Sequence, residues 1–283
     1  LVLGDIVGYG PMPAEVIENV CEYADEIVIG NHDAAVCGRT DPENFNDNAK
    51  RVIEWTQQRL SDDAIRFFEG LPTDLDGENF SIAHAELGDP ERFDYIDNPV
   101  IARETLAATD ANIVFVGHTH EPAIFVLDTE NDQLIQHEPT DFSTVPETRY
   151  VVNVGSVGDP RTEDIRACYC LYDSETQDVF FRLVPFDIDA YREDMLMTGL
   201  PVPPYFLSAD EQIESYIQAR HRRISIRAPK KKRITIRAGA LSDSSSEREM
   251  QMEQEEMQRE RERRKQQEQL KKKIASGLDA RPE

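Results

Sequence analysis

Four short segments carry side chains that could hold a divalent metal ion, and each segment follows a predicted strand. They are Gly4-Asp5, Gly30-Asn31-His32-Asp33, Ala83-His84 and Gly117-His118-Thr119-His120. Ligands collect at the carboxyl ends of strands in open α/β sheets, so we expect these segments to meet in space. Carboxylate, amide oxygen and imidazole suit first-row divalent metals, and the set contains no thiolate. Each segment alone is a weak signal, but their joint occurrence predicts a metal site.

The elements that must position these side chains alternate between strand and helix, which predicts an α/β fold. Apolar runs predict strands at 1–3, 26–30, 79–84, 113–116, 123–127, 150–154, 167–172 and 179–184. Helical spacing predicts helices over 46–60 and 61–69, the second with Ser61 as its N-cap, and two more from Ala14 and around 188–197. The last two strands flank a four-residue turn at 173–176 and read as a hairpin.

The alternation of predicted strands and helices ends near residue 200, at Pro201, Pro203 and Pro204. We predict a folded domain over 1–200, a Pro-containing linker with a basic repeat over 201–240, and a charged helical or disordered tail over 241–283. The repeat is Arg-Ile-Ser-Ile-Arg-Ala at 223–228, followed by Arg-Ile-Thr-Ile-Arg-Ala at 233–238. The last part is a low-complexity C-terminal extension rich in Glu, Gln, Arg, Lys and Ser.

Charge is distributed unevenly along the 283 residues, whose formal net charge is −24. Residues 1–200 hold 12 basic and 41 acidic side chains, whereas residues 201–283 hold 19 basic and 14 acidic ones. An acidic body argues against broad nucleic-acid binding by the first part, because duplex binding relies on neutralising phosphates. The excess of basic groups in 201–283 leaves an anionic partner for the tail as a hypothesis, beside that of a solubilising extension.

Membrane insertion and disulfide bonding are not indicated. The chain has no run of about 18 apolar residues, and no signal-peptide pattern is visible. The four cysteines form no Cys-x-x-Cys pair and no evident disulfide framework. We therefore expect no membrane association, and a cytoplasmic protein with reduced thiols.

The ordered motifs resemble those of calcineurin-like metallophosphoesterases. The matching blocks are Gly4-Asp5-Ile6-Val7-Gly8-Tyr9-Gly10, Gly30-Asn31-His32-Asp33 and Gly117-His118-Thr119-His120. The Asn-Val-Gly-Ser-Val-Gly-Asp-Pro-Arg run at 153–161 is similar to a block of the small bacterial and archaeal YfcE-like branch. This resemblance covers roughly residues 1–186. It implies a four-layer α/β-β/α sandwich with a two-metal site on one edge.

The resemblance also implies a ligand set. Asp5 would bridge the two metal ions, Asn31, His84 and His118 would complete the first, and His120 would bind the second. We expect manganese, with iron, zinc and nickel as alternatives. Two cations about 3.5–4 Å apart can hold both the attacking and the leaving oxygens of an in-line displacement, and a bridging water becomes a hydroxide nucleophile at neutral pH. The implied activity is hydrolysis of phosphoesters, as a phosphatase or phosphodiesterase.

Three further residues receive roles from the same resemblance. His32 would protonate the leaving oxygen or stabilise its charge, a task for which an imidazole with a shifted pKa is suited. Asp33 would orient His32. Arg161 would hold a substrate phosphate or carboxylate through a bidentate contact, although a structural pairing with an acidic residue is the alternative we favour for that side chain.

One family feature is not found in this sequence. An Asp-x-His motif normally supplies two ligands to the second metal, and we expect it one βα crossover, about 30 residues, before Asp5. Without it, we expect this chain to be weakly active or inactive, and an upstream segment to belong to the natural protein. The alternative function is a regulatory or metal-binding module that keeps the fold without catalysis. Candidate substrates are phosphorylated small molecules, nucleotides and phosphoproteins.

Overall fold

The computed structural model describes residues 1–207, which belong to one compact unit spanning Leu1–Arg223. The predicted basic repeat and the charged tail lie outside the described residues. Among the residues described, no helix is both long enough and apolar enough to cross a membrane.

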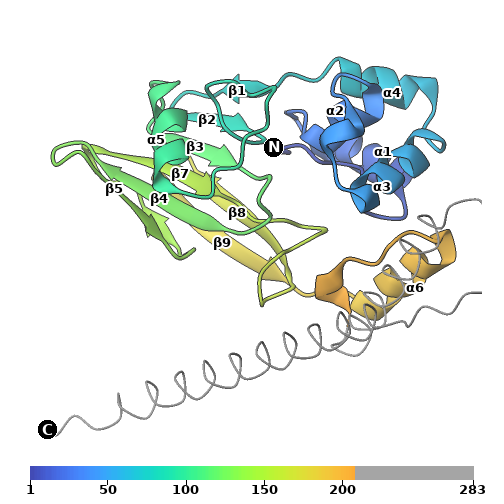
Figure 1. The fold of residues 1–283 in the computed structure, drawn as a ribbon. Coiled ribbons are helices and arrows are strands. Elements are labelled where there is room, and N and C mark those ends of the chain that lie inside the picture. Colours follow the sequence, from blue (N-terminus) through green and yellow to red (C-terminus); the bar gives the residue numbers. More distant parts are fainter. Residues whose placement is uncertain (208–283) are drawn as a thin grey trace, which may run out of the picture. The chain divides into compact units, whose positions relative to one another are not determined.

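The larger of two sheets (Figure 1) positions two of the four predicted ligand segments, Ala83-His84 and Gly117–His120. Its strand order is β1-β2-β3-β7-β4-β5, with bounds Asp74–Asp76, Phe80–Ala83, Ile113–Val116, Thr148–Asn153, Ala123–Asp128 and Gln133–His137. Strands β2, β3 and β7 are parallel, so their carboxyl ends share one edge. His84, Gly117 and Val154 directly follow these three strands and therefore lie at that edge.

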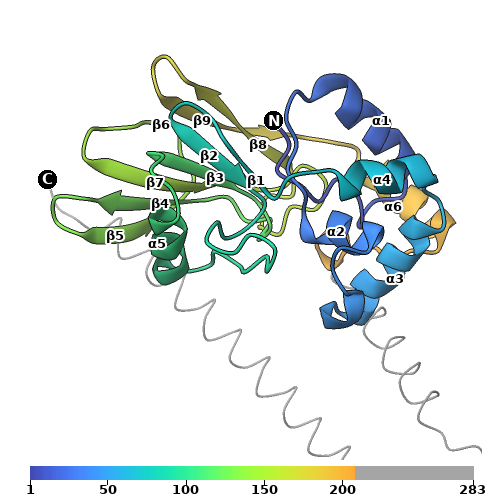
Figure 2. The ribbon, with the colours of Figure 1, turned by 90° about the horizontal axis from the view of Figure 1, so that it is seen from above.

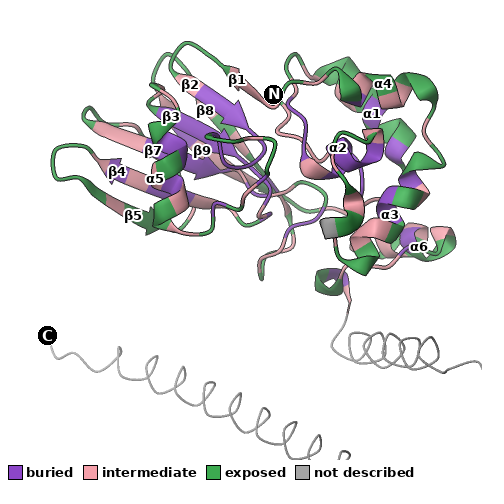
Figure 3. Cartoon of the chain, turned by 45° about the horizontal axis from the view of Figure 1, so that its top comes forward, coloured by how far each residue is buried: buried purple, intermediate pink, exposed green. Residues whose placement is uncertain are grey.

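A smaller antiparallel sheet has the order β6-β9-β8, with bounds Phe142–Ser143, Asp178–Val184 and Ala167–Asp173. Strands β8 and β9 form the predicted hairpin. The two sheets share one apolar cluster, in which Ile82, Phe115 and Val152 of the larger sheet pack with Val179 of the smaller. Figure 3 shows buried residues, in purple, along strands of both sheets. The predicted α/β class is confirmed.

Helices complete the fold (Figure 2). Helix α5, Pro99–Ala107, covers the other face of the larger sheet, where Ala102 and Leu106 share a cluster with Val114 and Val151. The remaining α-helices are α1 Pro13–Tyr23, α2 Asn31–Cys37, α3 Asp47–Gln57, α4 Asp62–Glu69 and α6 Ile188–Thr198, and short 3₁₀ turns occur at Pro42–Asn44 and Pro204–Phe206. The first four of these α-helices share an apolar cluster that includes Ile17, Ile53 and Phe68.

Local signals explain several helix boundaries. The Ser61 hydroxyl accepts a hydrogen bond from the Ala64 amide, which confirms the predicted N-cap of α4. Asn46 caps α3 in the same way, accepting from the Asn48 and Ala49 amides. The chain around the predicted boundary at residue 200 is packed, because Leu200 and Phe206 are both buried.

The structure differs from the sequence prediction at its shortest elements. The predicted strands at 1–3 and 26–30 form a single parallel bridge between Val2 and Ile27 rather than a ladder. Helix α2, helix α5 and strands β1, β5 and β6 were not predicted. Strand β5 is mostly exposed and polar, so it lacks the apolar alternation by which a strand is recognised.

Candidate metal centre

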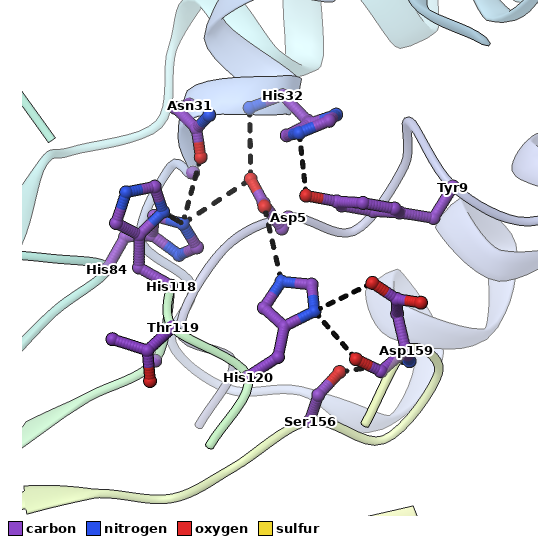
Figure 4. Close-up of polar contacts among 12 residues, drawn as sticks. Asp5, Tyr9, Asn31, His32, His84, His118, Thr119, His120, Ser156 and Asp159 are labelled. Atoms are coloured by element: carbon purple, nitrogen blue, oxygen red, sulfur yellow. Dashed lines mark hydrogen bonds and ion pairs between the residues drawn. The ribbon is translucent and has the colours of Figure 1, made fainter. Parts of the chain in front are cut away.

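The predicted ligand segments meet at the edge where the parallel strands end (Figure 4). Asp5 follows the Leu1–Leu3 segment and lies centrally. Asn31 begins α2, whereas His84 comes directly after β2. His118 and His120 come from the loop that follows β3. The structure thus brings together all five residues that were predicted to bind metal.

A first cation position is defined by four converging ligand atoms. Around Nε2 of His84 lie Asn31 Oδ1 at 3.2 Å, His118 Nδ1 at 3.1 Å and Asp5 Oδ1 at 3.5 Å. Ligand atoms of Asp5, His84 and His118 all lie within 4.8 Å of one another. This spacing allows one ion to contact them together.

The protonation of His84 shows why these atoms fit a cation. Its Nδ1 atom is 2.6 Å from the carbonyl oxygen of Leu3, which can only accept, so Nδ1 carries the proton. In a neutral His84, the form that binds a metal ion, Nε2 then presents a lone pair to the oxygen atoms of Asp5 and Asn31. Electron pairs facing one another in a buried site are unfavourable without a positive charge between them. Burial also lowers the pKa of His118 to about 3, assisted by the nearby His84, so this imidazole is neutral and able to ligate.

A second cation position lies on the other side of the Asp5 carboxylate. Oδ2 of Asp5 is buried without a hydrogen-bond partner among the described residues, and Nε2 of His120 is 4.0 Å away. Nδ1 of His120 lies 2.7 Å from the carbonyl oxygen of Asp159 and 3.0 Å from its carboxylate. Because both partners accept, Nδ1 holds a proton, and a neutral His120 therefore has its Nε2 available to bind an ion. Of the five predicted ligands, Asp5 and His120 are the two that face this position.

The carboxylate of Asp5 is held ionised between the two positions. Burial alone would raise its pKa, but positive charge at the His84 and His32 rings and a hydrogen bond from His120 hold the pKa well below the ordinary value, and a metal ion in their place would act in the same direction. Its Oδ1 also accepts a hydrogen bond of 3.0 Å from the His32 amide at the start of α2. An ionised, fixed carboxylate with both oxygens directed at cation positions is able to bridge two ions.

Unusual backbone conformations mark the same residues. Seven non-glycine residues in the described part of the chain have positive φ, and three of them are Asp5, His118 and His120, with φ of 52°, 64° and 63°. Such conformations are costly for residues other than glycine and are concentrated at functional sites. Asn153, at the end of β7, supports the His118 loop by donating to the Gly117 carbonyl and to the Thr119 hydroxyl.

Two glycines allow the ligand loops to approach each other. A Cβ at Gly30 would lie 2.2 Å from both the amide nitrogen and Oδ1 of Asp5, and one at Gly4 would lie 2.4 Å from the Gly30 amide nitrogen. Gly4 also has a φ of +81°. The close approach sets the distance between Asp5 and Asn31, so glycine is required at both positions.

We expect Gly30→Ala to disrupt the first cation position. The added methyl must displace Asp5, so the affinity for Mn²⁺ should fall by at least about tenfold, the scale of effect seen when support of a ligand is lost. Isothermal titration calorimetry with Mn²⁺ measures this affinity. Gly10→Ala is the matched control, since nothing lies within 4 Å of a Cβ there. Equal affinity in Gly30→Ala and Gly10→Ala would contradict the argument.

His32 lies beside the cation positions and is almost fully buried. Its Nε2 atom is 2.7 Å from the hydroxyl of Tyr9, and the two rings pack with centroids 4.1 Å apart. Burial lowers the pKa of His32, which favours the neutral imidazole. Asp33, predicted to orient His32, accepts instead from the amides of Val7 and Gly30, each at 3.1 Å. Asp33 therefore ties the Asp5 loop to α2, and Tyr9 supplies the contact to the imidazole ring.

Arg161 contacts the same group of residues. Its Nε and Nη2 atoms each lie 3.2 Å from Asp159 Oδ2, and Nη2 also donates to the Tyr9 hydroxyl at 3.2 Å. Asp159 and Tyr9 were not assigned roles from the sequence, although both fall within the blocks that carry the family resemblance. The signal that marks them is their position: Tyr9 lies in the loop after Asp5, and Asp159 lies two residues before Arg161.

The ligand residues open into a cavity of about 820 Å³. Its polar end is lined by Asp5, His84, His118, His120 and Tyr9. The rest is mainly apolar and runs between Leu1–Leu3 and the edge strand β8, over Phe80, Ile82 and Phe115. The cavity therefore combines a cluster of metal-binding groups with a mainly apolar lining.

Comparisons with known proteins agree with this geometry. Residues 1–177 match the model of the calcineurin-like phosphoesterase superfamily domain, and the chain belongs to this family. Membership indicates a metal-dependent phosphoester hydrolase. The predicted metallophosphoesterase fold and the predicted family are both confirmed.

Relatives of known sequence or structure extend the comparison. The chain is 30% identical over 203 residues to the uncharacterised protein MJ0912 of Methanocaldococcus jannaschii, covering 70% of this chain and 81% of that protein. A metallophosphoesterase from Sphaerobacter thermophilus is 36% identical with a TM-score of 0.62, covering 70% of this chain and 82% of that one. A hypothetical protein, PH1004 of Pyrococcus horikoshii, shares the fold at 22% identity and a TM-score of 0.55, with 70% and 79% covered. These archaeal and bacterial sources are consistent with the small-protein branch.

Proposed function

We propose that this protein hydrolyses phosphoesters at a two-metal centre bridged by Asp5. The observation that carries the proposal is the Asp5 carboxylate itself, whose two oxygens face two separate groups of potential ligand atoms. Asn31, His84 and His118 would hold one ion and His120 the other. Manganese is the proposed metal, with iron, zinc and nickel as alternatives that the same oxygen and nitrogen donors accept.

When bound, two divalent ions supply Lewis acidity and lower the pKa of a coordinated water, which is the chemistry that phosphoester hydrolysis requires. The protein's own groups must bind the substrate and stabilise the departing oxygen. His32 reaches the substrate side of the site through Tyr9, whose hydroxyl lies 2.7 Å from the His32 Nε2 atom. Arg161 has one terminal nitrogen, Nη1, with no acceptor among the described residues, and we assign it to the substrate phosphate.

The mainly apolar part of the cavity supports a proposal for the missing ligands of the second ion. It is bordered by Leu1–Leu3 on one side and by the edge strand β8 on the other, and Phe80, Ile82 and Phe115 line it. An extended apolar segment would bury these side chains and pair with the strand edges. We propose that a strand ending in Asp-x-His occupies this part of the cavity and places its two ligands beside His120.

The substrate class follows only in broad terms from this site. A phosphorylated small molecule, a nucleotide or a phosphoprotein each presents the phosphate that the centre would bind, and the metal ligands do not distinguish among them. We propose a cytoplasmic location, because the four cysteines are free thiols in the structure. An anionic partner for the basic repeat at 223–238 remains a proposal that lies outside the described residues.

One observation favours a second function. Of the predicted ligands, only Asp5 and His120 lie at the second cation position. A protein that bound a single ion would be a metal-binding or regulatory module with little catalysis. A phosphoesterase and a metal-binding module differ in whether they turn over a phosphoester substrate. We expect hydrolysis of p-nitrophenyl phosphate or its bis-ester that depends on Mn²⁺ and is abolished by a chelator. Tight metal binding with no turnover of either ester, in protein carrying an Asp-x-His strand, would favour the module.

A further inference from the structure

Tyr9 lines the cavity beside the metal ligands, and His32 contacts Tyr9 from the side away from the cavity. Tyr9 lines the cavity together with Asp5 and His120, whereas His32 does not border it. The Tyr9 ring also lies edge-on to the His120 ring, with centroids 5.1 Å apart. A substrate phosphate held near Asp5 and His120 would therefore meet the phenol of Tyr9 before it met the imidazole of His32.

The hydrogen bonds around the Tyr9 oxygen show which groups donate to it. Arg161 Nη2 lies 3.2 Å away and can only donate, since a guanidinium has no acceptor atom. His32 Nε2 lies 2.7 Å away. The other ring nitrogen of His32, Nδ1, is buried with no partner in the described part of the chain. Nδ1 is unsatisfied in either tautomer, but an orphaned N–H donor is rarer in buried sites than an orphaned acceptor, so we assign the proton to Nε2, which then donates to Tyr9.

The phenol proton is then left for an outside acceptor. Two N–H donors occupy the two lone pairs of the Tyr9 oxygen, and no protein acceptor within residues 1–207 takes its O–H. Asp159 holds Arg161 in position beside Tyr9, because its carboxylate accepts hydrogen bonds from both Arg161 and the Nδ1 atom of His120. The hydroxyl is thus oriented by protein groups before any ligand arrives.

We propose that the Tyr9 hydroxyl donates a hydrogen bond to an oxygen of the substrate phosphate, held in that orientation by Arg161 and His32. This inference rests on the proposed function and adds to it a residue that contacts the substrate. His32 then acts through Tyr9 and not by direct contact.

The test compares the full chain and its Tyr9→Phe variant in binding inorganic phosphate, measured by titration calorimetry in the presence of Mn²⁺. Loss of one hydrogen bond to a charged oxygen should weaken phosphate binding by roughly tenfold or more. Tyr23→Phe is the control, since Tyr23 is 77% exposed at the end of α1. Mn²⁺ affinity should be the same in all three proteins, which separates loss of the phosphate contact from damage to the metal ligands.

A second measurement examines the wild-type protein directly. Long-range ¹H–¹⁵N correlation spectra report which nitrogen of His32 is protonated, and we expect Nε2. Protonation at Nδ1, or equal phosphate affinity in Tyr9→Phe and wild type, would overturn the role of Tyr9 and leave the proposed function standing. If wild-type protein bound Mn²⁺ but neither bound phosphate nor hydrolysed phosphoesters with an Asp-x-His strand supplied, both proposals would fail.

Discussion

Asp5→Asn should abolish function, with Mn²⁺ affinity lowered by at least about a hundredfold and any Mn²⁺-dependent hydrolysis lowered by about a thousandfold or more. Asp5 is the carboxylate of the ligand group around His84 and His118, and its second oxygen faces His120. The amide keeps the size of the side chain, and its oxygen can still accept from the His32 amide. The change therefore removes a negative charge and one bridging atom while the local fold is retained.

The measurements are Mn²⁺ titration and initial rates of p-nitrophenyl phosphate hydrolysis. Asp164→Asn provides the control, because Asp164 is a partly exposed carboxylate that pairs with Arg166 away from the ligand atoms. Circular dichroism and thermal melting of each variant check that it is folded. An Asp5→Asn protein that bound Mn²⁺ as tightly as Asp164→Asn would show that the ligand assignment is wrong.

His32→Ala should have the next largest effect, and its size should depend on the leaving group. For an alkyl phosphoester, whose departing alkoxide needs stabilisation, we expect the rate constant kcat to fall by about 10²–10³-fold. For p-nitrophenyl phosphate, whose phenolate leaves readily, the loss should be several-fold. Mn²⁺ affinity should change little, because His32 is not among the ligand atoms that converge on either cation position.

The effect of His32 should also be linked to that of Tyr9. If His32 acts through the Tyr9 hydroxyl, the double variant His32→Ala with Tyr9→Phe should lose little more activity than the more damaging single variant, since residues in one hydrogen-bond network are not additive. Where the oxygen that accepts from Tyr9 is the departing one, Tyr9→Phe should also reproduce the dependence on the leaving group. Independent, multiplicative losses, or an equal loss for both kinds of ester, would contradict this part of the account.

The ligand set could be predicted from the sequence because each ligand follows a strand or a glycine-marked turn. His84, His118 and His120 come after β2 and β3, and parallel strands bring their carboxyl ends to one edge whatever the details of packing. The hairpin of β8 and β9 and the N-cap at Ser61 were predictable for a similar reason, since both depend on residues close together in the sequence.

The supporting contacts could not be predicted in this way. The hydrogen bond between Tyr9 and Arg161 joins residues 152 positions apart, and the one between His120 and Asp159 spans 39 positions. No local pattern encodes such pairs, because they depend on how two loops pack. Helix α2 was missed because its seven residues begin with the polar ligand segment, which reads as a loop after a strand. Asp33 illustrates the same limit, as its partners are backbone amides that no side-chain pattern reveals.

The most direct test of the metal centre is anomalous X-ray scattering from crystals of this protein grown with Mn²⁺. The account predicts a strong manganese peak in contact with Asp5 Oδ1, Asn31 Oδ1, His84 Nε2 and His118 Nδ1, and a weaker one between Asp5 Oδ2 and His120 Nε2. The stronger peak should disappear in Asp5→Asn. Absence of manganese among these four atoms at saturating Mn²⁺, with ordered density for the side chains, would contradict the central claim.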